Sequence, residues 1–244
     1  MVVFFAVVAF AIYHKANNVA ATCFDRKQNQ SEAGIDCGGP CNNYCAYQLS
    51  DPIVEWVRVF PVTPGIVDAV AYVKNNYPTA AAQNVSYDFK LYDASNNVVA
   101  DRTGSTFLGP AGETAIVETL IPIANSTVAL TRFSFTDPIA WQKISPTFLQ
   151  TVINTDRNHT ENFDGGTRLT ATLENDSRLN FLNTDTVALF YDKDGNVITA
   201  SKVLVPALPA LQSKVVYFTW PYPVNNIVRT QIIPRINPFT AQPL

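Results

Sequence analysis

The sequence predicts an all-β protein built mainly from two tandem β-sandwiches. Three observations carry this prediction: a composition suited to strands, a repeat of about 99 residues, and cysteines confined to one short stretch. Aromatic residues make up 11% of the 244 residues, and Val, Ile and Thr are abundant. Such side chains suit a half-buried pleated surface. Sixteen prolines also disfavour long helices.

Charge is scarce along the chain and shows no block of one sign. Only 15% of the residues are charged, against about 25% in a typical soluble domain. The net charge is -3 and there is no basic cluster. The composition therefore excludes a surface built to neutralise nucleic-acid phosphates.

The chain starts with an apolar run from Val2 to Tyr13, which is followed by His14 and Lys15. As a helix this run spans roughly 18 Å, whereas a bilayer core needs about 20 residues. We interpret residues 1–20 as a membrane anchor or signal-like helix. A cleaved signal peptide and a buried helix of a globular core are the two alternatives.

All four cysteines lie in residues 21–48, directly after the apolar run: Cys23, Cys37, Cys41 and Cys45. Their spacing, C-x13-C-x3-C-x3-C, lacks the paired C-x2-C knuckles of zinc ribbons, and no histidine lies nearby. An even number of clustered cysteines favours two disulfides in an oxidising compartment. A metal–thiolate site and a reactive thiol are alternatives, and all three disulfide pairings stay open.

Four side chains with oxygen donors lie between these cysteines: Asp25, Asn29, Glu32 and Asp36. Donors this dense are able to hold Ca²⁺, although the spacing is not that of an EF-hand. The alternative is local capping, with Asp25 capping a short helical turn and Asp36 accepting hydrogen bonds from the turn at Gly38-Gly39. Calcium is the one cofactor that the sequence suggests.

The same stretch resembles a short cysteine-rich motif of bacterial envelope and secreted proteins, C-x-D-x-x-x-N-x-x-E-x-G-x-D-C-G-G-P-C. Residues from Cys23 to Cys41 match it at every defined position. This chain has Arg26 where the motif usually has Gly after the first Asp. The resemblance implies an extracytoplasmic location and no reaction.

Two copies of one β unit follow, at residues 71–123 and 171–223. Each copy contains a strand ending at an Asn turn, then a hairpin, then two further strands. About seven short strands per 100 residues is the immunoglobulin-like count. We therefore expect immunoglobulin-like domains at residues 49–146 and 147–236. The tail, residues 237–244, is interpreted as a disordered end or as a segment that docks on a neighbouring subunit.

The hairpins are similar to those of the FxLYD family of immunoglobulin-like domains. Phe89-Lys90-Leu91-Tyr92-Asp93 matches the name motif, and Ala188-Leu189-Phe190-Tyr191-Asp192 has Ala at the first position. The family shares a fold and no common activity, so the resemblance implies no catalytic site. Structural roles are expected for the aromatic residue and the carboxylate of each copy: Tyr92, Asp93, Tyr191 and Asp192.

Catalytic signatures are scarce in the sequence. His159 lies in a polar segment, interpreted as a loop, with Asp156 and Asp164 near it. No phosphate-binding glycine loop appears. We therefore expect no catalytic residues and no enzyme activity; an enzyme centred on His159 is the least favoured hypothesis. Sequons for N-glycosylation occur at Asn29, Asn84, Asn125, Asn158 and Asn175.

These features together predict a membrane-anchored, extracytoplasmic protein with a structural or adhesive role. Its expected partners are the membrane, other envelope or surface proteins and other copies of itself, and no nucleic acid. The alternative is an extracellular module for a ligand or glycan, with or without calcium, that uses Trp141 or Trp220. Buried positions for both tryptophans would discard that version.

Overall fold

The computed structural model describes residues 23–244 apart from residues 30, 125, 150–152 and 156. The expected N-terminal helix lies outside the described residues. Among the residues that are described, no helix is long and apolar enough to cross a membrane. The chain divides into two compact units, Met1–Leu49 and Ser50–Leu244. The first contains the cysteines and is called the Cys-rich unit below.

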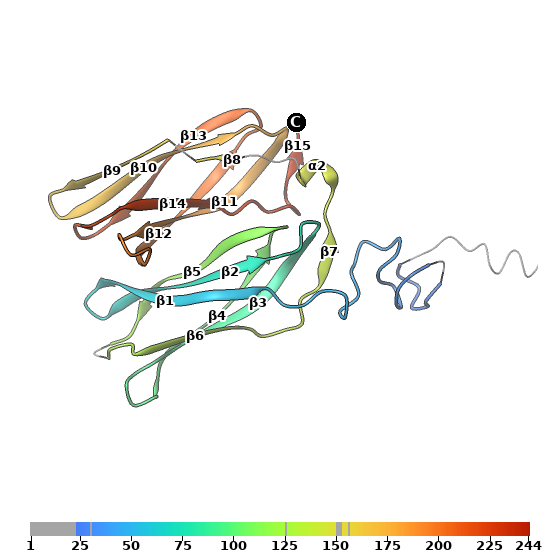
Figure 1. The fold of residues 1–244 in the computed structure, drawn as a ribbon, viewed down its shortest axis with the longest axis horizontal. Coiled ribbons are helices and arrows are strands. Elements are labelled where there is room, and N and C mark those ends of the chain that lie inside the picture. Colours follow the sequence, from blue (N-terminus) through green and yellow to red (C-terminus); the bar gives the residue numbers. More distant parts are fainter. Residues whose placement is uncertain (1–22, 30, 125, 150–152, 156) are drawn as a thin grey trace, which may run out of the picture. The chain divides into compact units, whose positions relative to one another are not determined.

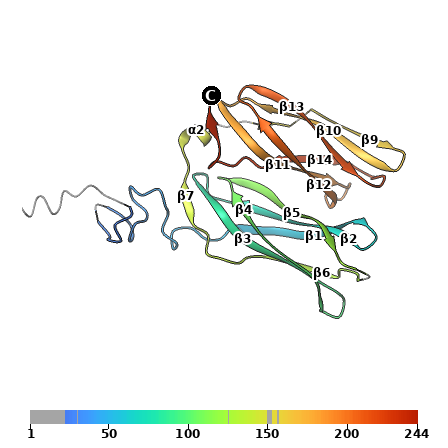
Figure 2. The ribbon, with the colours of Figure 1, turned by 180° about the vertical axis from the view of Figure 1, so that it is seen from behind.

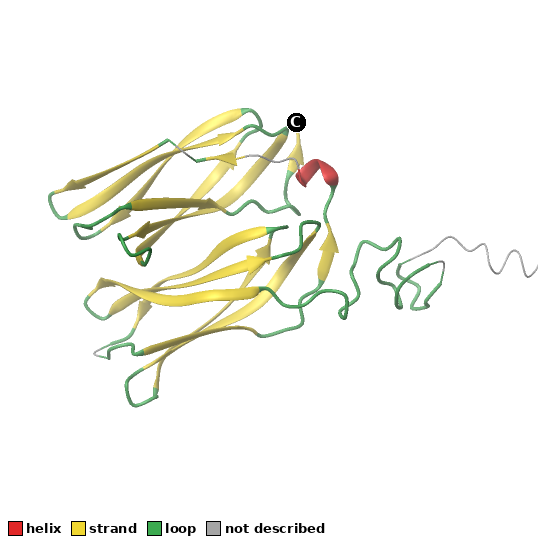
Figure 3. Ribbon diagram, viewed as in Figure 1, coloured by secondary structure: helices red, strands yellow, loops and turns green. Residues whose placement is uncertain are grey.

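The second unit is almost entirely β-structure, as the sequence predicts (Figure 3). Its first half forms two antiparallel sheets with strand orders β1-β2-β5 and β4-β3-β6, and β7 also pairs with β3. The strands are β1 (Ile53–Thr63), β2 (Ile66–Asn75), β3 (Ala80–Tyr92), β4 (Val98–Leu108), β5 (Gly112–Pro122), β6 (Leu130–Phe135) and β7 (Trp141–Lys143).

The second half repeats this arrangement after the short helix α2 (Pro146–Leu149). Its sheets have strand orders β13-β10-β8, with β9 also on β10, and β12-β11-β14, with β15 also on β11. The strands are β8 (Ile153–Asn154), β9 (Asn158–Phe163), β10 (Gly166–Asn175), β11 (Leu179–Tyr191), β12 (Val197–Leu208), β13 (Gln212–Trp220), β14 (Arg229–Pro234) and β15 (Gln242–Pro243).

Equivalent residues of the two halves adopt equivalent conformations. Asn84 on β3 and Asn183 on β11 lie 99 positions apart, and both have positive φ values, 55° and 50°. The pairing of β3 with β4 shifts register between Ala82 and Val85. Asn tolerates the left-handed conformation that a bulge imposes. The sequence repeat therefore corresponds to a repeat of backbone structure.

The four sheets of the second unit stack in layers, and the two central layers belong to different sandwiches (Figures 1 and 2). The β1-β2-β5 sheet faces the β12-β11-β14 sheet. Between them lies a core of buried residues contributed by both halves: Phe60, Val70, Tyr72, Ala115, Val117, Val187, Leu189, Tyr191, Val197, Ala200 and Ile233. We call this the intersandwich core. A separate core fills the second sandwich.

Burial along the central strands explains why the halves join. On β13 buried and exposed residues alternate toward the end of the strand, as expected for a sheet with one face in water. On β11 every residue from Val187 to Tyr191 is buried. Continuous burial requires cover on both faces of the strand, and the intersandwich core provides the second cover.

The repeat shows how the sequence encodes this contact. Val187 and Leu189 point into the intersandwich core, whereas the equivalent residues of the first half are Asp88 and Lys90. Lys90 Nζ lies 3.1 Å from Asp88 Oδ2, and the lysine side chain is partly exposed. The face of β3 that carries Asp88 and Lys90 is therefore polar, and its sheet is an outer layer of the stack. The equivalent face of β11, with Val187 and Leu189, is apolar and packs on the first sandwich.

Polar contacts also cross the intersandwich core. Gln231 Nε2 donates to Tyr72 Oη at 2.8 Å, and Tyr191 Oη donates to Gln231 Oε1 at 2.5 Å. Tyr72 Oη in turn donates to Glu113 Oε2 at 2.7 Å. Burial and this contact with Glu113 raise the pKa of Tyr72, which keeps its hydroxyl a donor. Trp56 stacks on the Tyr72 ring with centroids 5.0 Å apart.

A buried asparagine fixes the corner at the end of β2 and again at the end of β10. Asn175 Nδ2 donates to the carbonyl oxygens of Leu179, Leu208 and Pro209, and its Oδ1 accepts from Ser177 N. Asn75 makes the same kind of contacts in the first half. Because the Asn175 amide is fully buried and occupied, this sequon is closed to a glycan.

The C-terminal tail belongs to the second sandwich, which corrects the expectation for residues 237–244. β15 pairs with β11 through Leu179 and Asn180, and Leu244 N donates to Arg178 O at 3.0 Å. β7 occupies the equivalent place on β3. The tail is not a disordered end, because its own sheet holds it, and docking of the tail on another subunit stays a prediction.

Candidate functional site

The Cys-rich unit is held by two disulfides, Cys23–Cys41 and Cys37–Cys45. The disulfide prediction is therefore confirmed, and the structure selects one of the three pairings. No free cysteine remains in the described residues. The bonds close loops with sequence separations of 18 and 8, and a unit this short needs such crosslinks because its core is too small to hold it.

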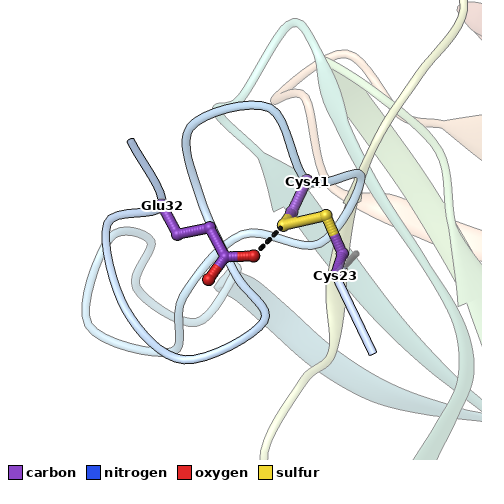
Figure 4. A group of neighbouring side chains, drawn as sticks. All are labelled: Cys23, Glu32 and Cys41. Carbon is purple, nitrogen blue, oxygen red and sulfur yellow. Dashed lines mark hydrogen bonds between the residues drawn. A yellow bond between two sulfur atoms is a disulfide. The ribbon is translucent and has the colours of Figure 1, made fainter. Parts of the chain in front are cut away.

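Glu32 lies against the first disulfide (Figure 4). Its Oε1 is 3.2 Å from Cys41 Sγ, and with Cys23 these atoms form the one cluster of ligand type found among the described residues. Glu32 is buried, and its Oε2 accepts a hydrogen bond from Asn29 N at 3.1 Å. Because both sulfurs are bonded to each other, they are not thiolates available to a metal.

Two of the other predicted calcium ligands, Asp25 and Asp36, already act as acceptors within the chain, whereas the buried Oδ1 of Asn29 has no hydrogen-bond partner among the described residues. Asp36 accepts from Asp25 N at 3.1 Å and from Arg26 N at 3.0 Å. Asp25 accepts from Lys27 N at 2.9 Å and from Asn29 Nδ2 at 2.9 Å. This is capping, although Asp36 caps the turn at Asp25-Arg26 rather than the one at Gly38-Gly39. Calcium binding by these four residues stays a prediction.

Gly39 shows why the loop between the cysteines needs glycine. Its φ is +52°, and a Cβ at this position would lie 2.0 Å from Ser31 O. A side chain there would collide with main chain that cannot move aside. The Gly-Gly-Pro turn is therefore required by close packing of the loop on itself.

Arg26 occupies a left-handed position, with a φ of 60°. This conformation costs an L-residue about 1–2 kcal/mol, and glycine adopts it freely. After the larger chain entropy of unfolded glycine is subtracted, Arg26→Gly is expected to stabilise the Cys-rich unit by roughly 0.5–1 kcal/mol. Slower proteolysis within this unit checks the prediction. Lys27→Gly, at a position without positive φ, is the control and should speed proteolysis.

The two disulfides are expected to differ in their contribution to stability. Replacing Cys23 and Cys41 by serine should cost the unit roughly 3 kcal/mol, and replacing Cys37 and Cys45 roughly 2.5 kcal/mol, because the longer loop gains more freedom when unfolded. Limited proteolysis read by mass spectrometry compares the two variants within the same unit. Equal cleavage of both variants and the parent protein would contradict the prediction.

The predicted structural residues of the hairpins form two closely similar turns. Asp93 accepts from Ser95 N and Asn97 N, and Asp192 accepts from Asp194 N and Asn196 N. Hydrogen bonds from Asn97 lower the pKa of Asp93, and those from Asn196 lower the pKa of Asp192. Each carboxylate thus stabilises its turn above its unfolded pKa and loses this effect as acid protonates it.

The two tyrosines of the repeat differ. Tyr92 is half-buried, and the guanidinium of Arg132 lies 5.5 Å from its ring centroid. Tyr191 is buried in the intersandwich core, and the guanidinium of Arg229 lies 3.4 Å from its ring centroid. The second tyrosine therefore joins the two sandwiches rather than packing on its hairpin alone.

Both candidate ligand-binding tryptophans are buried, each with 3% of its surface exposed. Trp220 stacks on Phe190 and donates its indole N–H to Ala200 O. Trp141 contacts the Tyr77 ring edge-on. The ligand-binding hypothesis in the version that uses these tryptophans is therefore wrong.

His159 lies on the edge strand β9 and not in a loop, which corrects the expectation for this segment. It is exposed and sits opposite Thr170 on β10. Asp164 follows in the exposed turn to β10, and Asp156 lies outside the described residues.

A polar cleft of about 470 Å³ opens between the two sandwiches. Its charged lining residues are Glu118 from β5, Asp185 from β11, Lys202 from β12 and Arg235, which follows β14. Hydroxyl and amide groups also line it, from Gln83, Asn84, Tyr87, Ser105, Thr106, Asn237 and Thr240, and Phe107, Ile116 and Val117 supply apolar surface. Tyr87 Oη donates to Glu118 Oε1 at 2.7 Å, and Lys202 Nζ donates to Val117 O at 3.0 Å.

Arg235 is the central group of this cleft, and it is buried, with 8% of its surface exposed. Its guanidinium donates to Thr106 Oγ1, to Phe107 O at 3.2 Å and to Thr114 Oγ1 at 3.2 Å, all in the first sandwich. Burial lowers its pKa, and the charge of Asp185 opposes this effect. Among the described residues, no carboxylate forms an ion pair with it.

Sequence reasoning did not select Arg235. The available signal was a charged residue directly after the apolar run Ile232-Ile233-Pro234. A buried guanidinium held by neutral acceptors is able to attract a carboxylate or phosphate, because the charge is only partly compensated.

No protein-family model matches the sequence, and no curated protein matches it. Solved structures with some similarity include a β-glucuronidase from glycoside hydrolase family 2, with 10% identity over 89% of this chain and 29% of that chain at a TM-score of 0.21. Procruciferin, the 11S globulin of Brassica napus, has 8% identity over 76% of this chain and 85% of its own, with a TM-score of 0.17. Vicilin from hazelnut, Corylus avellana, has 7% identity over 82% and 86%, with a TM-score of 0.14. These TM-scores are too low to assign a fold or a function.

Proposed function

We propose that this protein is an extracytoplasmic, non-catalytic structural or adhesive subunit that acts through contacts with other proteins and is held at a membrane by its N-terminal segment. The two disulfides support the location, because such bonds persist in oxidising compartments and are rare in the cytosol. The anchoring role rests on the apolar run from Val2 to Tyr13.

The intersandwich core is the observation that carries the structural role. Domains joined by a linker move relative to each other unless a large apolar interface joins them. Here the core includes fully buried residues from both halves, such as Val70 and Leu189, and hydrogen bonds from Gln231, Lys202 and Arg235 reinforce it. A rigid block of this kind transmits force and presents fixed surfaces, as a building element requires.

Thiol state and location test this proposal together. The full-length protein is isolated from its source without reductant, and its mass is measured after thiol alkylation with and without prior reduction. We expect no alkylation before reduction and four alkylated cysteines after it. Protease added to intact cells should cleave the protein and spare a cytosolic control. Four free thiols, or protection from the protease until the cells are lysed, would exclude the proposed location.

The polar cleft favours a second candidate function, the binding of a small ligand that carries a carboxylate. Arg235 and Lys202 supply positive charge, while Tyr87, Asn237 and Thr240 supply neutral hydrogen-bonding groups. Glu118 and Asp185 lie near the two cations without forming an ion pair with Arg235 and offset part of the positive charge, so a polar ligand with one acidic group fits better than a polyanion.

Titration calorimetry with galacturonate tests this candidate, with neutral galactose as the matched ligand. Galacturonate should release or absorb heat and galactose should not. Lys202→Gln is expected to weaken galacturonate binding by about tenfold to about a hundredfold, since hydrogen bonds to charged groups are worth roughly 1.5–3 kcal/mol. Lys193→Gln, on the exposed β11–β12 turn, is the control. No heat with galacturonate, inorganic phosphate or citrate would end this candidate.

A further inference from the structure

The edge of the β8-β9-β10-β13 sheet formed by β13 has few of the features that keep edge strands apart, and Lys214 is its one charged residue. β13 ends its sheet, with β10 on one side only. It pairs with β10 over nine consecutive residues without a register shift. Its sequence, QSKVVYFTW, contains no Pro, Gly or acidic residue and is rich in β-branched and aromatic side chains. Such an edge is a template for another strand.

The equivalent edge of the first sandwich, β5, is protected. Its pairing with β2 shifts register next to Asp68, and Leu120 has a φ of 56°. Asp68 Oδ1, on the β2 side, accepts from Leu120 N at 2.8 Å and fixes this bulge, which breaks the regular run of β5 main chain along the edge. β5 also carries Glu113 and Glu118 and ends at Pro122. The edge strand β5 therefore has features that prevent pairing with another strand, whereas the equivalent strand β13 does not have them.

The remaining edges of the four sheets are each interrupted or short. Proline occurs within or at the end of β1, β12 and β14, charged residues lie on β4 and β6, and β9 is short and polar. At the end of β13, Ser201 Oγ donates to Thr219 O and Trp220 Nε1 donates to Ala200 O, so β12 covers that end. These contacts engage Thr219 and Trp220, so the open part of the β13 edge is Gln212 to Phe218.

We propose that β13 pairs antiparallel with β13 of a second copy of this chain, about a two-fold axis at Val216. This inference rests on the proposed function and names its partner. The sequence is self-complementary in this register. Val215 lies opposite Tyr217 of the second copy, and the two-fold axis produces a second pair of the same kind. Both side chains are exposed in the single chain, Val215 by 48% and Tyr217 by 57%. Pairs of an aromatic and a β-branched residue across strands are favourable.

Charge also fits this register. Lys214, the one charged residue of β13, lies opposite Phe218 of the second copy and not opposite another lysine. Val216 lies opposite Val216 of the second copy, on the two-fold axis. The two β8-β9-β10-β13 sheets then become one continuous sheet across an isologous interface. Main-chain hydrogen bonds give the pairing its strength, and Val215 and Tyr217 give it its register.

Sedimentation of the intact, oxidised protein tests the pairing. The average mass is expected to rise from one chain to two between about 1 µM and about 1 mM, since strand addition alone buries a small interface. The doubly substituted variant Val215→Glu/Tyr217→Glu places like charges opposite each other and should stay a single chain throughout. Leu204→Glu, equally exposed on edge strand β12, is the matched control and should associate like the parent.

A mixing experiment identifies the register. Val215→Lys/Tyr217→Lys should also stay a single chain, and mixing it with the Val215→Glu/Tyr217→Glu variant should restore a mass of two chains through opposite-charge pairs. Circular dichroism confirms that each variant is folded. A parent protein of one-chain mass at all concentrations, association of the Glu variant, or no rescue on mixing would each overturn the pairing. Thiol oxidation and surface location would be unaffected, so the proposed function would stand or fall separately.

Discussion

Leu189→Lys is expected to lower the free energy of unfolding by at least about 4 kcal/mol. Leu189 is fully buried in the intersandwich core, and lysine there would lose apolar contacts and bury an unpaired charge. Urea denaturation followed by tryptophan fluorescence measures the change. The substitution is chosen because lysine stands at the equivalent place in the first half, as Lys90.

The reverse substitution, Lys90→Leu, is the matched control. The Lys90 side chain is 42% exposed, so leucine there removes a partly exposed ion pair worth about 1 kcal/mol, and Ser134 Oγ still donates to the buried Asp88 carboxylate. The same pair of residue types exchanged at equivalent positions should therefore give very different costs. Similar costs for the two variants would show that the sandwiches do not pack through the β11 face.

Asn175→Ala is expected to cost about 4 kcal/mol, at the upper end of single substitutions. It removes three donated hydrogen bonds and leaves the buried carbonyl oxygens of Leu179, Leu208 and Pro209 without that donor. Each unsatisfied buried group costs about 1–3 kcal/mol, with partial relaxation of the corner. Urea denaturation again provides the measurement.

Asn76→Ala provides the control for the asparagine prediction. Asn76 is exposed and follows the equivalent corner residue, Asn75. A surface substitution of this kind changes stability by at most about 0.5 kcal/mol. If Asn175→Ala were as mild as this control, the corner would be held by the strands alone and not by the buried amide.

Local features of the fold were predictable because they depend on neighbours in the chain. The hairpin turns closed by Asp93 and Asp192 follow from Asn and Gly chemistry within a few residues. The strands follow from alternation and from β-branched and aromatic residues. Crowding of four cysteines into 23 residues, Cys23 to Cys45, also predicts crosslinks without further knowledge.

Contacts between distant residues were not predictable in the same way. The disulfide pairing, the place of β15 on β11 and the burial of Trp141 and Trp220 each depend on how separate segments meet. Arg235 donates to residues more than 120 positions away. The pattern of polar and apolar residues along one strand does not indicate which distant residue will contact it.

The sequence by itself determined that this chain is made of strands and that its second half repeats its first, and it favoured crosslinks among the clustered cysteines over the alternatives. Only the tertiary structure decided that the two sandwiches join face to face and that a buried arginine and an open β13 edge result. The reason is physical. Strand formation and turn chemistry act over a few residues, whereas the choice of which apolar face covers which is a competition among all faces of the folded chain.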